Sequence, residues 1–404
     1  MRIICRLYLA AITSIASIGR EPYINPVPGQ FPILAWYSIR PDAEQTTERY
    51  QELAEAGFNI SFSHFATRQE IANALNACRG TGVKLMLTTQ DLEKEEHTGT
   101  VVNQFKNDEM VAGWFLRDEP TPHRFQELKK FKERILSFDS KHMLYLNLLP
   151  NYVSLDYLGT SSYREYIRKF VDDIDLGFFS YDHYPVVIHN GDTIVRPLFY
   201  SNLEDALAVS QSTGEPFWAF ALSTAHDPYP TATKEMLRLE VFSNLAYGAQ
   251  GIQYFTYWNP GNTGTWNFNT APISLDGHKT HVWYLVRELN KEIQQLAPVF
   301  LGAKVIDVSH TGKAIPQGTH PLKSLPLPIT GIQSDGEGVV VSHLKNAGKE
   351  YLMIVNRDLH HPQTVTIQKK GKVQYWSTCQ PPSTDRSRNI QCTLNPGDYF
   401  IVML

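Results

Sequence analysis

Short apolar runs alternate with amphipathic segments from residue 31 to residue 296. Each apolar run is followed by polar residues, which is typical of parallel strands that are buried on both faces. The predicted strands are Phe31–Ser38, Phe58–Phe65, Val83–Thr89, Met110–Arg117, Met143–Leu149, Ile174–Tyr181, Pro216–Ser223 and Gly251–Trp258. The predicted helices are Ala43–Ala56, Ile71–Cys78, Thr121–Phe138, Ser161–Val171, Asn202–Ser212, Thr233–Tyr247 and Lys279–Leu296.

Eight strands with helices between them predict an α/β fold, a closed (β/α)8 TIM barrel. The alternative is a doubly wound open sheet, which usually carries a Gly-rich phosphate loop after its first strand. No such loop follows Ser38, so the barrel is favoured. We expect the helix after the fourth strand to begin with Thr121 as N-cap and Pro122 as first helical residue.

The pattern changes after Gly302, where short strand-like segments are joined by Gly, Pro, Asn and Asp turns. The stretch from Pro316 to Pro328 contains four prolines and predicts an irregular connection. We therefore expect an export signal in residues 1–20, a barrel in residues 21–302 and a small all-β sandwich in residues 303–404 that packs on the barrel. The sandwich strands are Gly338–His343, Tyr351–Asn356, Thr364–Gln368, Val373–Trp376 and Tyr399–Leu404.

The N-terminus has the pattern of a signal peptide. Residues 1–6 are basic, and residues 7–18 are apolar but too few and too rich in Ser and Thr for a membrane span. We expect a secreted or periplasmic protein; the alternative is an ordinary buried N-terminal segment. Cys379 and Cys392 flank a polar loop and could form a disulfide, which an exported protein would permit.

Composition and missing motifs narrow the function. A net charge of −4 over 404 residues, without a Lys or Arg cluster, gives no electrostatic footprint for nucleic acid. No later segment approaches about 18 continuous apolar residues, so we expect no integral membrane segment in the mature protein. Zinc, serine-hydrolase and phosphate-binding motifs are missing, so we expect neither a metal nor a cofactor. The 20 Tyr, 20 Phe and 7 Trp fit a sugar site as well as a large core.

Functional side chains of a barrel project from the C-terminal ends of its strands. The fourth strand ends in Asp118 and Glu119, which puts consecutive acids at the barrel mouth. Glu119 is the strongest catalytic candidate; the alternative is an acid that only favours the dipole of the next helix. Eight more residues at the strand ends are candidates for substrate binding. They are Tyr37, His64, Asp118, Asn147, His183, Tyr184, Tyr257 and Trp258.

The ending Asp118-Glu119-Pro120 resembles the Asn-Glu-Pro motif of retaining glycosidases with (β/α)8 barrels, the clan that includes family-42-like β-galactosidases. Residues 251–258 resemble the aromatic floor of that clan, and residues 272–280 resemble the end of its barrel. The resemblance covers residues 31 to 300. It implies a glycoside hydrolase in which Glu119 is the acid/base and Trp258 stacks on a sugar. It does not identify the sugar, because one barrel clan hosts many.

One departure concerns the nucleophile. The clan places it, a Glu, at the end of strand seven, but Pro216–Thr224 has no carboxylate and Glu215 precedes the strand. Glycoside hydrolysis normally needs two carboxylates. Asp182, at the end of strand six, is the best second acid, as nucleophile or as base, and Asp118 and Asp227 are lesser candidates. The alternative for Asp182 is a carboxylate that hydrogen-bonds His183 or a substrate hydroxyl.

The sequence thus predicts an enzyme that cleaves a glycosidic bond in an oligo- or polysaccharide without a cofactor. Two alternatives stay open. One is a non-catalytic glycan-binding barrel protein that has lost its nucleophile, and the other is a polysaccharide lyase with Tyr184 or His183 as base. The sugar, the anomer, the linkage, exo or endo action, and the oligomeric state are left open by the sequence.

Overall fold

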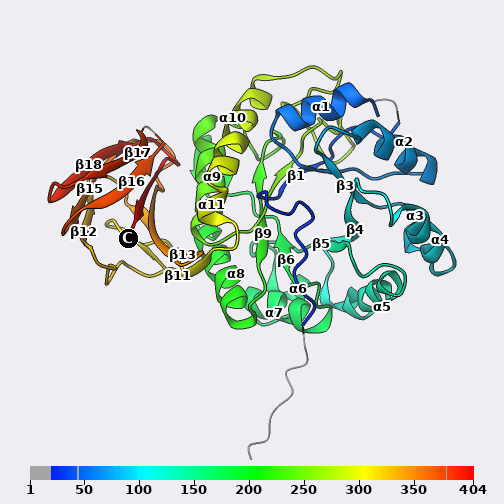
Figure 1. The fold of residues 1–404 in the computed structure, drawn as a ribbon, viewed down its shortest axis with the longest axis horizontal. Coiled ribbons are helices and arrows are strands. Elements are labelled where there is room, and N and C mark those ends of the chain that lie inside the picture. The colour runs from blue at the N-terminus through cyan, green and yellow to red at the C-terminus, as the bar shows by residue number, and fades with distance from the viewer. Residues whose placement is uncertain (1–19, 43–44, 379) are drawn as a thin grey trace, which may run out of the picture.

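All eight predicted barrel strands are present in the computed structural model, which describes residues 20–42, 45–378 and 380–404. Every pairing among them is parallel, in the order β5-β4-β3-β2-β1-β10-β9-β6. A bridge between Leu148 and Tyr181 joins the two ends, so the sheet closes into the predicted barrel (Figure 1). The strands are β1 (Ile33–Trp36), β2 (Ile60–Phe62), β3 (Lys84–Leu87), β4 (Val111–Asp118), β5 (Met143–Asn147), β6 (Phe179–Tyr181), β9 (Phe217–Leu222) and β10 (Ile252–Phe255).

Helices surround the barrel (Figure 1). They are α1 (Thr47–Glu55), α2 (Arg68–Cys78), α3 (Gln90–Glu93), α4 (Glu95–Phe105), α5 (Phe125–Leu136), α6 (Leu155–Leu158), α7 (Tyr163–Asp173), α8 (Phe199–Thr213), α9 (Lys234–Ala246), α10 (His281–Gln295) and α11 (Ala297–Phe300). Thr121 occupies the predicted N-cap position before Pro122, but its side chain makes no capping hydrogen bond. Residues Pro122–Arg124 instead form a 3-10 turn, with Pro122 at its start, and α5 follows.

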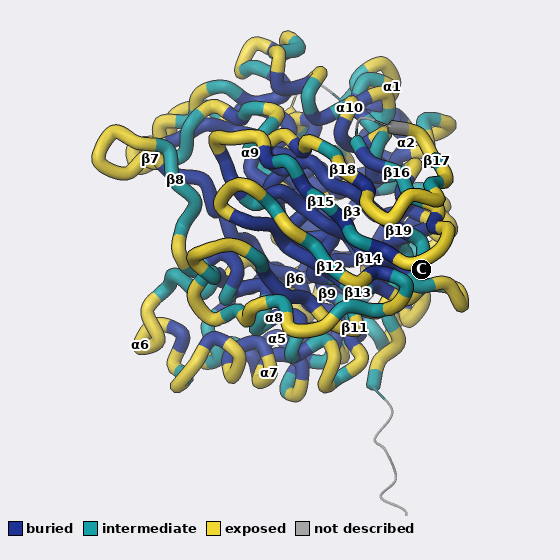
Figure 2. Tube along the Cα trace, turned by 90° about the vertical axis from the view of Figure 1, so that its left-hand side faces the viewer, coloured by how far each residue is buried: buried dark blue, intermediate teal, exposed yellow. Residues whose placement is uncertain are grey.

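A hairpin that the sequence did not predict is inserted between β6 and α8. Its strands are β7 (Val186–His189) and β8 (Asp192–Val195), and its exposed tip projects from the body of the protein (Figure 2). The Ile188 N–H donates to the Pro228 carbonyl at 2.9 Å, and the His360 ring meets the Thr193 carbonyl at 2.9 Å. The hairpin is therefore held to the barrel on one side and to the C-terminal domain on the other.

The C-terminal domain is the predicted all-β sandwich. One antiparallel sheet has the order β11-β13-β14-β19-β16-β17 and the other the order β12-β15-β18. The strands are β11 (Lys304–His310), β12 (Ile329–Ser334), β13 (Val339–Asn346), β14 (Lys349–Asn356), β15 (Gln363–Lys369), β16 (Val373–Ser377), β17 (Gln380–Asp385), β18 (Asn389–Leu394) and β19 (Tyr399–Met403).

The larger sheet is buried on both faces. Along β13, Val339 and Val341 join the core between the two sheets, whereas Val340 joins the core of the barrel. This alternation follows from the period of two along a strand. Arg238 of α9 adds a buried ion pair between the domains, because its Nε donates to Asp398 at 2.6 Å. The sandwich packs on the barrel, as predicted.

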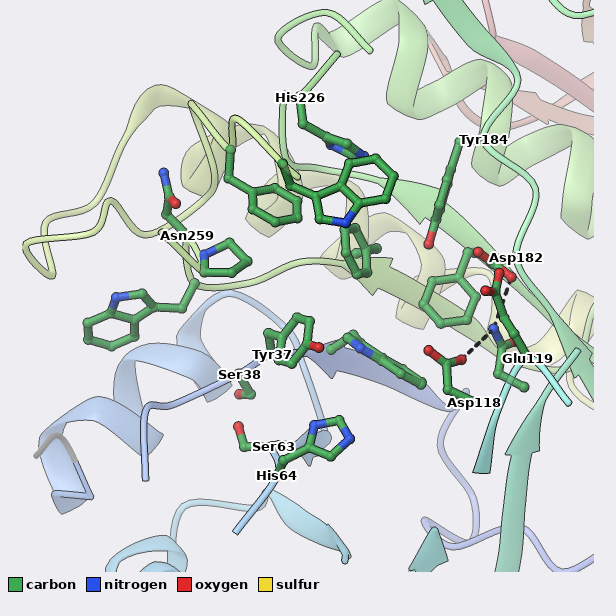
Figure 3. A pocket seen from close by; sticks show the side chains of 18 of the residues that line it. Tyr37, Ser38, Ser63, His64, Asp118, Glu119, Asp182, Tyr184, His226 and Asn259 are labelled. Atoms are coloured by element: carbon green, nitrogen blue, oxygen red, sulfur yellow. Dashed lines mark hydrogen bonds between the residues drawn. The ribbon is translucent and has the colours of Figure 1, made fainter. Parts of the chain in front are cut away.

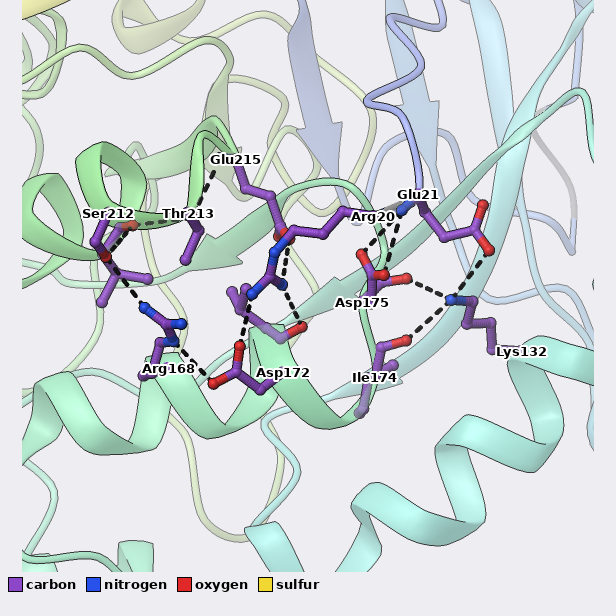
Figure 4. Close-up of polar contacts among 12 residues, drawn as sticks. Arg20, Glu21, Lys132, Arg168, Asp172, Ile174, Asp175, Ser212, Thr213 and Glu215 are labelled. Atoms are coloured by element: carbon purple, nitrogen blue, oxygen red, sulfur yellow. Dashed lines mark hydrogen bonds and ion pairs between the residues drawn. The ribbon is translucent and has the colours of Figure 1, made fainter. Parts of the chain in front are cut away.

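The N-terminal segment is bound to the barrel at the end opposite its mouth (Figure 4). The Arg20 guanidinium donates to Asp172 at 2.7 Å and to Glu215 at 3.0 Å. Arg20 was assigned to the export signal, but these contacts make it part of the folded barrel domain. The rest of that signal and Cys379 of the predicted disulfide lie outside the described residues. No helix in the described ranges is long and apolar enough to cross a membrane.

An aromatic layer fills the barrel below its mouth. Trp36 of β1 contacts Phe62, Phe115, Tyr145 and Phe220, with ring centroids 4.5 to 6.1 Å apart. These rings come from five different strands. Trp36 and Phe220 of this layer also line a pocket at the C-terminal strand ends.

Candidate active site

A register shift near the end of β4 decides which side chains face the barrel interior. Arg117 and Asp118 pair with Leu146 and Asn147, one residue out of step with the pairs before them. The shift turns Arg117 away from the mouth, where its guanidinium lies 3.8 Å from the Glu93 carboxylate. It also places Asp118 on the same face as Asn147.

Glu119 follows in a left-handed backbone conformation, with φ of 45°. Such a conformation is uncommon for a non-glycine residue and costs on the order of 1–3 kcal/mol. Two hydrogen bonds hold it: the Glu119 N–H donates to the Asn147 carbonyl at 2.8 Å, and the Tyr166 hydroxyl donates to the Pro120 carbonyl at 2.7 Å. The Glu119 carboxyl lies beside Asp182 as a result (Figure 3).

Asn147 connects the acids of β4 and β6. Its Nδ2 donates to Asp182 at 3.0 Å and to Asp118 at 3.3 Å. Its Oδ1 accepts a hydrogen bond from the Ser180 hydroxyl at 3.0 Å, and that hydroxyl accepts one from Gln253 Nε2 at 2.7 Å. Because Ser180 donates to Oδ1, the Asn147 amide group must present Nδ2 to the carboxylates.

Burial raises the pKa of all three carboxyl groups. Asp182 is buried, whereas Asp118 and Glu119 are exposed toward the pocket, and the surrounding protein disfavours the charged form of each. Burial, then the charges of Glu119 and Asp118, raise the pKa of Asp182 well above its usual range. Burial also raises the pKa of Glu119, and burial with the Glu119 charge raises the pKa of Asp118 to about 7.

The Glu119 and Asp182 carboxyl groups also interact directly, which lowers the pKa of Glu119 and raises that of Asp182. Two carboxylates cannot both be ionised at such close range, so one of them keeps its proton near neutral pH. Proton exchange between an acid and a carboxylate is therefore available at the barrel mouth.

The acids lie at one end of a pocket of about 870 Å³ (Figure 3). This volume is typical of a small-molecule site. Six of the eight predicted substrate-binding residues line it, together with Glu119 and Asp182; they are Tyr37, His64, Asp118, Asn147, Tyr184 and Trp258. In the described parts of the chain, no group of three or more His, Cys, Asp or Glu side chains is arranged to hold a metal ion.

Tyr257 does not line the pocket, which corrects its predicted role in substrate binding. Its side chain is 1% exposed and lies behind the residues that line the pocket. Its hydroxyl accepts a hydrogen bond from Trp283 Nε1 at 3.2 Å and donates one to Glu52 at 3.4 Å. Phe255 and Trp258 face the pocket from this segment instead.

His183 is the second correction. Side chains alternate along a strand end, so the neighbours Asp182 and Tyr184 face the pocket while His183 faces away. Its ring packs on Tyr152 and Phe199, with centroids 5.1 and 5.4 Å away. Burial lowers the pKa of His183 to about 3, so the ring is neutral.

Sequence analysis missed a second aromatic wall of the pocket. It consists of His226 and Tyr229 after β9, and of Trp266 and Phe268 in the loop after β10. The sequence did contain a signal for this wall. Two large aromatic residues occur in the polar segment 261–270, whose pattern predicts neither a helix nor a strand that would bury them. How that loop folds over the mouth depends on tertiary contacts.

The remaining acids lie away from the pocket lining. The Asp227 carboxylate accepts a hydrogen bond from Asn267 Nδ2 at 2.7 Å. Glu215 lies at the opposite end of the barrel, as predicted, and is paired with Arg20. At the end of strand seven, the Ser223 hydroxyl donates to the Thr256 carbonyl at 2.7 Å.

Comparisons with known proteins relate the chain to glycosidases. Residues 151–296 match the family model of the glycoside hydrolase 42 family, described as β-galactosidase. The matched segment includes Asp182 and begins after Glu119. No curated protein matches the chain.

Solved structures with the same fold are distant in sequence. A catalytic mutant of Gan42B, a family-42 β-galactosidase from G. stearothermophilus, has a TM-score of 0.62 at 9% identity, over 95% of this chain and 100% of that one. The β-galactosidase from Bacillus circulans sp. alkalophilus has a TM-score of 0.61 at 10% identity, over 93% and 99%. A family-5 glycoside hydrolase from Bacteroides vulgatus has a TM-score of 0.57 at 12% identity, over 92% and 89%. At these identities the likeness concerns the fold.

The barrel, its pocket lined by carboxyl groups, and the family match together define a glycoside hydrolase of the (β/α)8-barrel class. Within that class, the segment from the β5–α6 loop to α10 is similar to the family-42 β-galactosidases.

Proposed function

We propose that the chain hydrolyses an O-glycosidic bond with Glu119 as acid/base and Asp182 as nucleophile. One observation carries the proposal: these two carboxyl groups, from β4 and β6, lie side by side in the pocket and interact directly (Figure 3). A pair that shares one proton provides both the acid and the carboxylate that glycoside hydrolysis requires.

The proposed roles require that Glu119 carries the shared proton when the substrate binds. The Asn147 amide donates to Asp182 and so stabilises its ionised form. In the free site the balance is the opposite, because burial and the charges of Glu119 and Asp118 raise the pKa of Asp182 well above its usual range, whereas the interaction with Asp182 lowers the pKa of Glu119. The proton therefore has to pass from Asp182 to Glu119 as the substrate binds.

The direct interaction between the two carboxyl groups supports retention of configuration. Inverting enzymes hold their two carboxyl groups about 6.5–9.5 Å apart to leave room for a water, and retaining enzymes about 5–5.5 Å. Carboxyl groups that interact directly are closer to the retaining arrangement.

In the proposed reaction, an Asp182 oxygen attacks the anomeric carbon as its bond to the leaving oxygen breaks. The Glu119 proton passes to that oxygen. Glu119 then takes a proton from water, whose oxygen attacks the same carbon and releases Asp182.

We propose a β-galactoside as the first substrate to test, supported by the description of the family model that matches residues 151–296. Tyr37, His64 and Asn147 are proposed to bind sugar hydroxyls, and Tyr184 and Trp258 to pack on the sugar ring. A lyase reaction has less support, because burial raises the pKa of Tyr184 well above its usual range and His183 does not face the pocket.

The test compares wild type, Glu119→Gln and Asp182→Asn on a panel of p-nitrophenyl glycosides that begins with the β-galactoside. Both variants should lose at least about 100-fold in kcat/KM, because each removes a group that reacts. The control Glu109→Gln changes a carboxylate that is 78% exposed and should be fully active. Full activity of Glu119→Gln would contradict the proposal. So would a wild type that binds oligosaccharides and releases no sugar from the panel, as a glycan-binding protein would.

We also propose that the protein is exported, on the basis of residues 1–18 alone. Because Arg20 binds Asp172 and Glu215, cleavage should leave Arg20 in the mature chain. N-terminal sequencing of protein recovered outside the cytoplasm tests this, and a mature chain that begins after Arg20 would contradict it.

A further inference from the structure

A wall of three rings lies across the pocket from the acids. Trp266 and Phe268 are stacked with centroids 6.2 Å apart, and the His226 ring packs on both at 5.5 and 5.0 Å. We call these three residues the Trp266 wall; all of them line the pocket. Figure 3 shows His226 on the far side of the pocket from Asp118 and Glu119.

The Trp266 wall is held in place by hydrogen bonds between two loops. The Asn269 N–H donates to the Ala225 carbonyl at 2.8 Å, and the Ala225 N–H donates to the Thr270 carbonyl at 2.8 Å. The Asp227 N–H donates to Asn267 Oδ1 at 2.9 Å. These bonds join residues 225–227 to residues 267–270, so the wall is formed before any ligand binds.

His226 lines the pocket, and one of its ring nitrogens is available as a hydrogen-bond acceptor. Its Nδ1 lies 3.0 Å from the Thr224 carbonyl, and a carbonyl only accepts, so Nδ1 carries the proton. Burial lowers the pKa of His226, which keeps the ring neutral. Nε2 therefore has a free lone pair, and no partner for it occurs within the described ranges.

Both ends of the pocket combine buried and exposed side chains. At the acid end, Asn147 and Tyr184 are buried, whereas Asp118 and Glu119 are exposed. At the other end, His226 is 6% exposed and Trp266 is 47% exposed. The reacting sugar belongs with the carboxyl pair, so the remainder of the substrate should extend across the pocket toward the Trp266 wall.

We propose that the Trp266 wall is the subsite for the leaving-group sugar. One face of that sugar stacks on Trp266, and one of its hydroxyls donates to His226 Nε2. The three side chains of the wall are uncharged, which fits a neutral sugar. The inference rests on the proposed function and adds that the natural substrate is at least a disaccharide.

The test uses three substrates with one reacting sugar and different leaving groups. β-Galactosyl fluoride has no leaving-group ring, p-nitrophenyl β-galactoside has a ring without a hydroxyl, and β-1,4-galactobiose has a second sugar. If the panel identifies another reacting sugar, the corresponding three compounds replace these. A wild type that cleaves none of them overturns the proposed function itself.

Two variants separate stacking from hydrogen bonding. Trp266→Ala should lower kcat/KM about tenfold or more on the nitrophenyl glycoside and the disaccharide, and leave the fluoride unchanged. His226→Phe keeps an aromatic ring but loses Nε2, so it should lower kcat/KM only on the disaccharide. Tyr284→Ala, which removes a 49% exposed ring outside the pocket, is the control and should change nothing.

Two results would overturn the subsite. An equal loss on all three substrates in Trp266→Ala would mean that the wall contacts the reacting sugar or only supports the fold. An unchanged kcat/KM of Trp266→Ala on galactobiose would mean that the leaving sugar does not contact the wall.

Discussion

Glu240 gives the fold a pH dependence that a single substitution can reveal. The side chain lies on α9, is 2% exposed, and accepts a hydrogen bond from the Leu222 N–H at 2.6 Å. Burial raises the pKa of Glu240 from 4.5 to about 8. Glu240→Gln keeps the shape and an oxygen that can accept the Leu222 hydrogen bond, but it carries no charge at any pH.

The magnitude follows from that shift. A carboxyl with a raised pKa binds its proton more tightly in the folded chain than in the unfolded chain. Its contribution to stability is fully present below about pH 4.5 and is lost as the pH rises through about 8. The shift is about 3.5 pKa units at about 1.4 kcal/mol each, which makes the loss on the order of 5 kcal/mol.

Urea unfolding of both proteins at about pH 5, 7 and 9 measures this effect. Wild type and Glu240→Gln should have similar free energies of unfolding at the lowest pH. At the highest pH the free energy of unfolding of the variant should exceed that of wild type by several kcal/mol. The difference between the two proteins cancels contributions from other acids. Glu109→Gln is the exposed control and should follow wild type. A stability difference between Glu240→Gln and wild type that does not change with pH would refute the reasoning.

Three further predictions concern other buried polar groups. Asn147→Ala removes a donor that favours the ionised form of Asp182. The acidic limb of the pH profile of kcat/KM should therefore move to higher pH by about one unit. An acidic limb at the same pH as in wild type would contradict this. Arg238→Met leaves Asp398 buried without its partner and should lower the free energy of unfolding by about 3–5 kcal/mol, measured by urea unfolding of the full chain; a loss under about 1 kcal/mol would show that the pair contributes little. Arg20→Ala leaves the Glu215 carboxylate without its cation and should destabilise the chain by about 1–3 kcal/mol in the same assay; unchanged stability would mean that this contact is unimportant.

The barrel could be predicted because its strands are buried on both faces and therefore appear as apolar runs. Elements without that pattern were missed. Helices α3 and α4 follow one another across Lys94 in a mainly polar segment, and their buried positions are few. Strand β17 includes two prolines and shows no alternation, whereas β18 alternates polar and apolar residues and was missed although this signal was present.

The site was predictable as far as position along the chain determines it. The order of the strands put Asp118, Glu119 and Asp182 at one mouth, and all three line the pocket. His183 and Tyr257 were predicted wrongly because adjacent residues at one strand end were both taken as site residues. In a regular strand, only every second side chain faces the interior.

Two features of the site depend on pairing between segments. The register shift that places Asp118 inward arises from how β4 pairs with β5. The Trp266 wall arises from hydrogen bonds between two loops. Neither leaves a local pattern in the sequence that fixes the outcome.

The central claim is that Glu119 acts as acid/base and Asp182 as nucleophile, and rescue by azide tests it most directly. The measurement is the anomeric configuration of the glycosyl azide that Glu119→Ala and Asp182→Ala form from 2,4-dinitrophenyl β-galactoside. Without the acid/base, azide attacks the glycosyl-enzyme, so Glu119→Ala should yield the β-azide. Without the nucleophile, azide attacks the substrate directly, so Asp182→Ala should yield the α-azide. The reverse pattern would exchange the two roles, and azide-independent, wild-type activity of either variant would contradict the account.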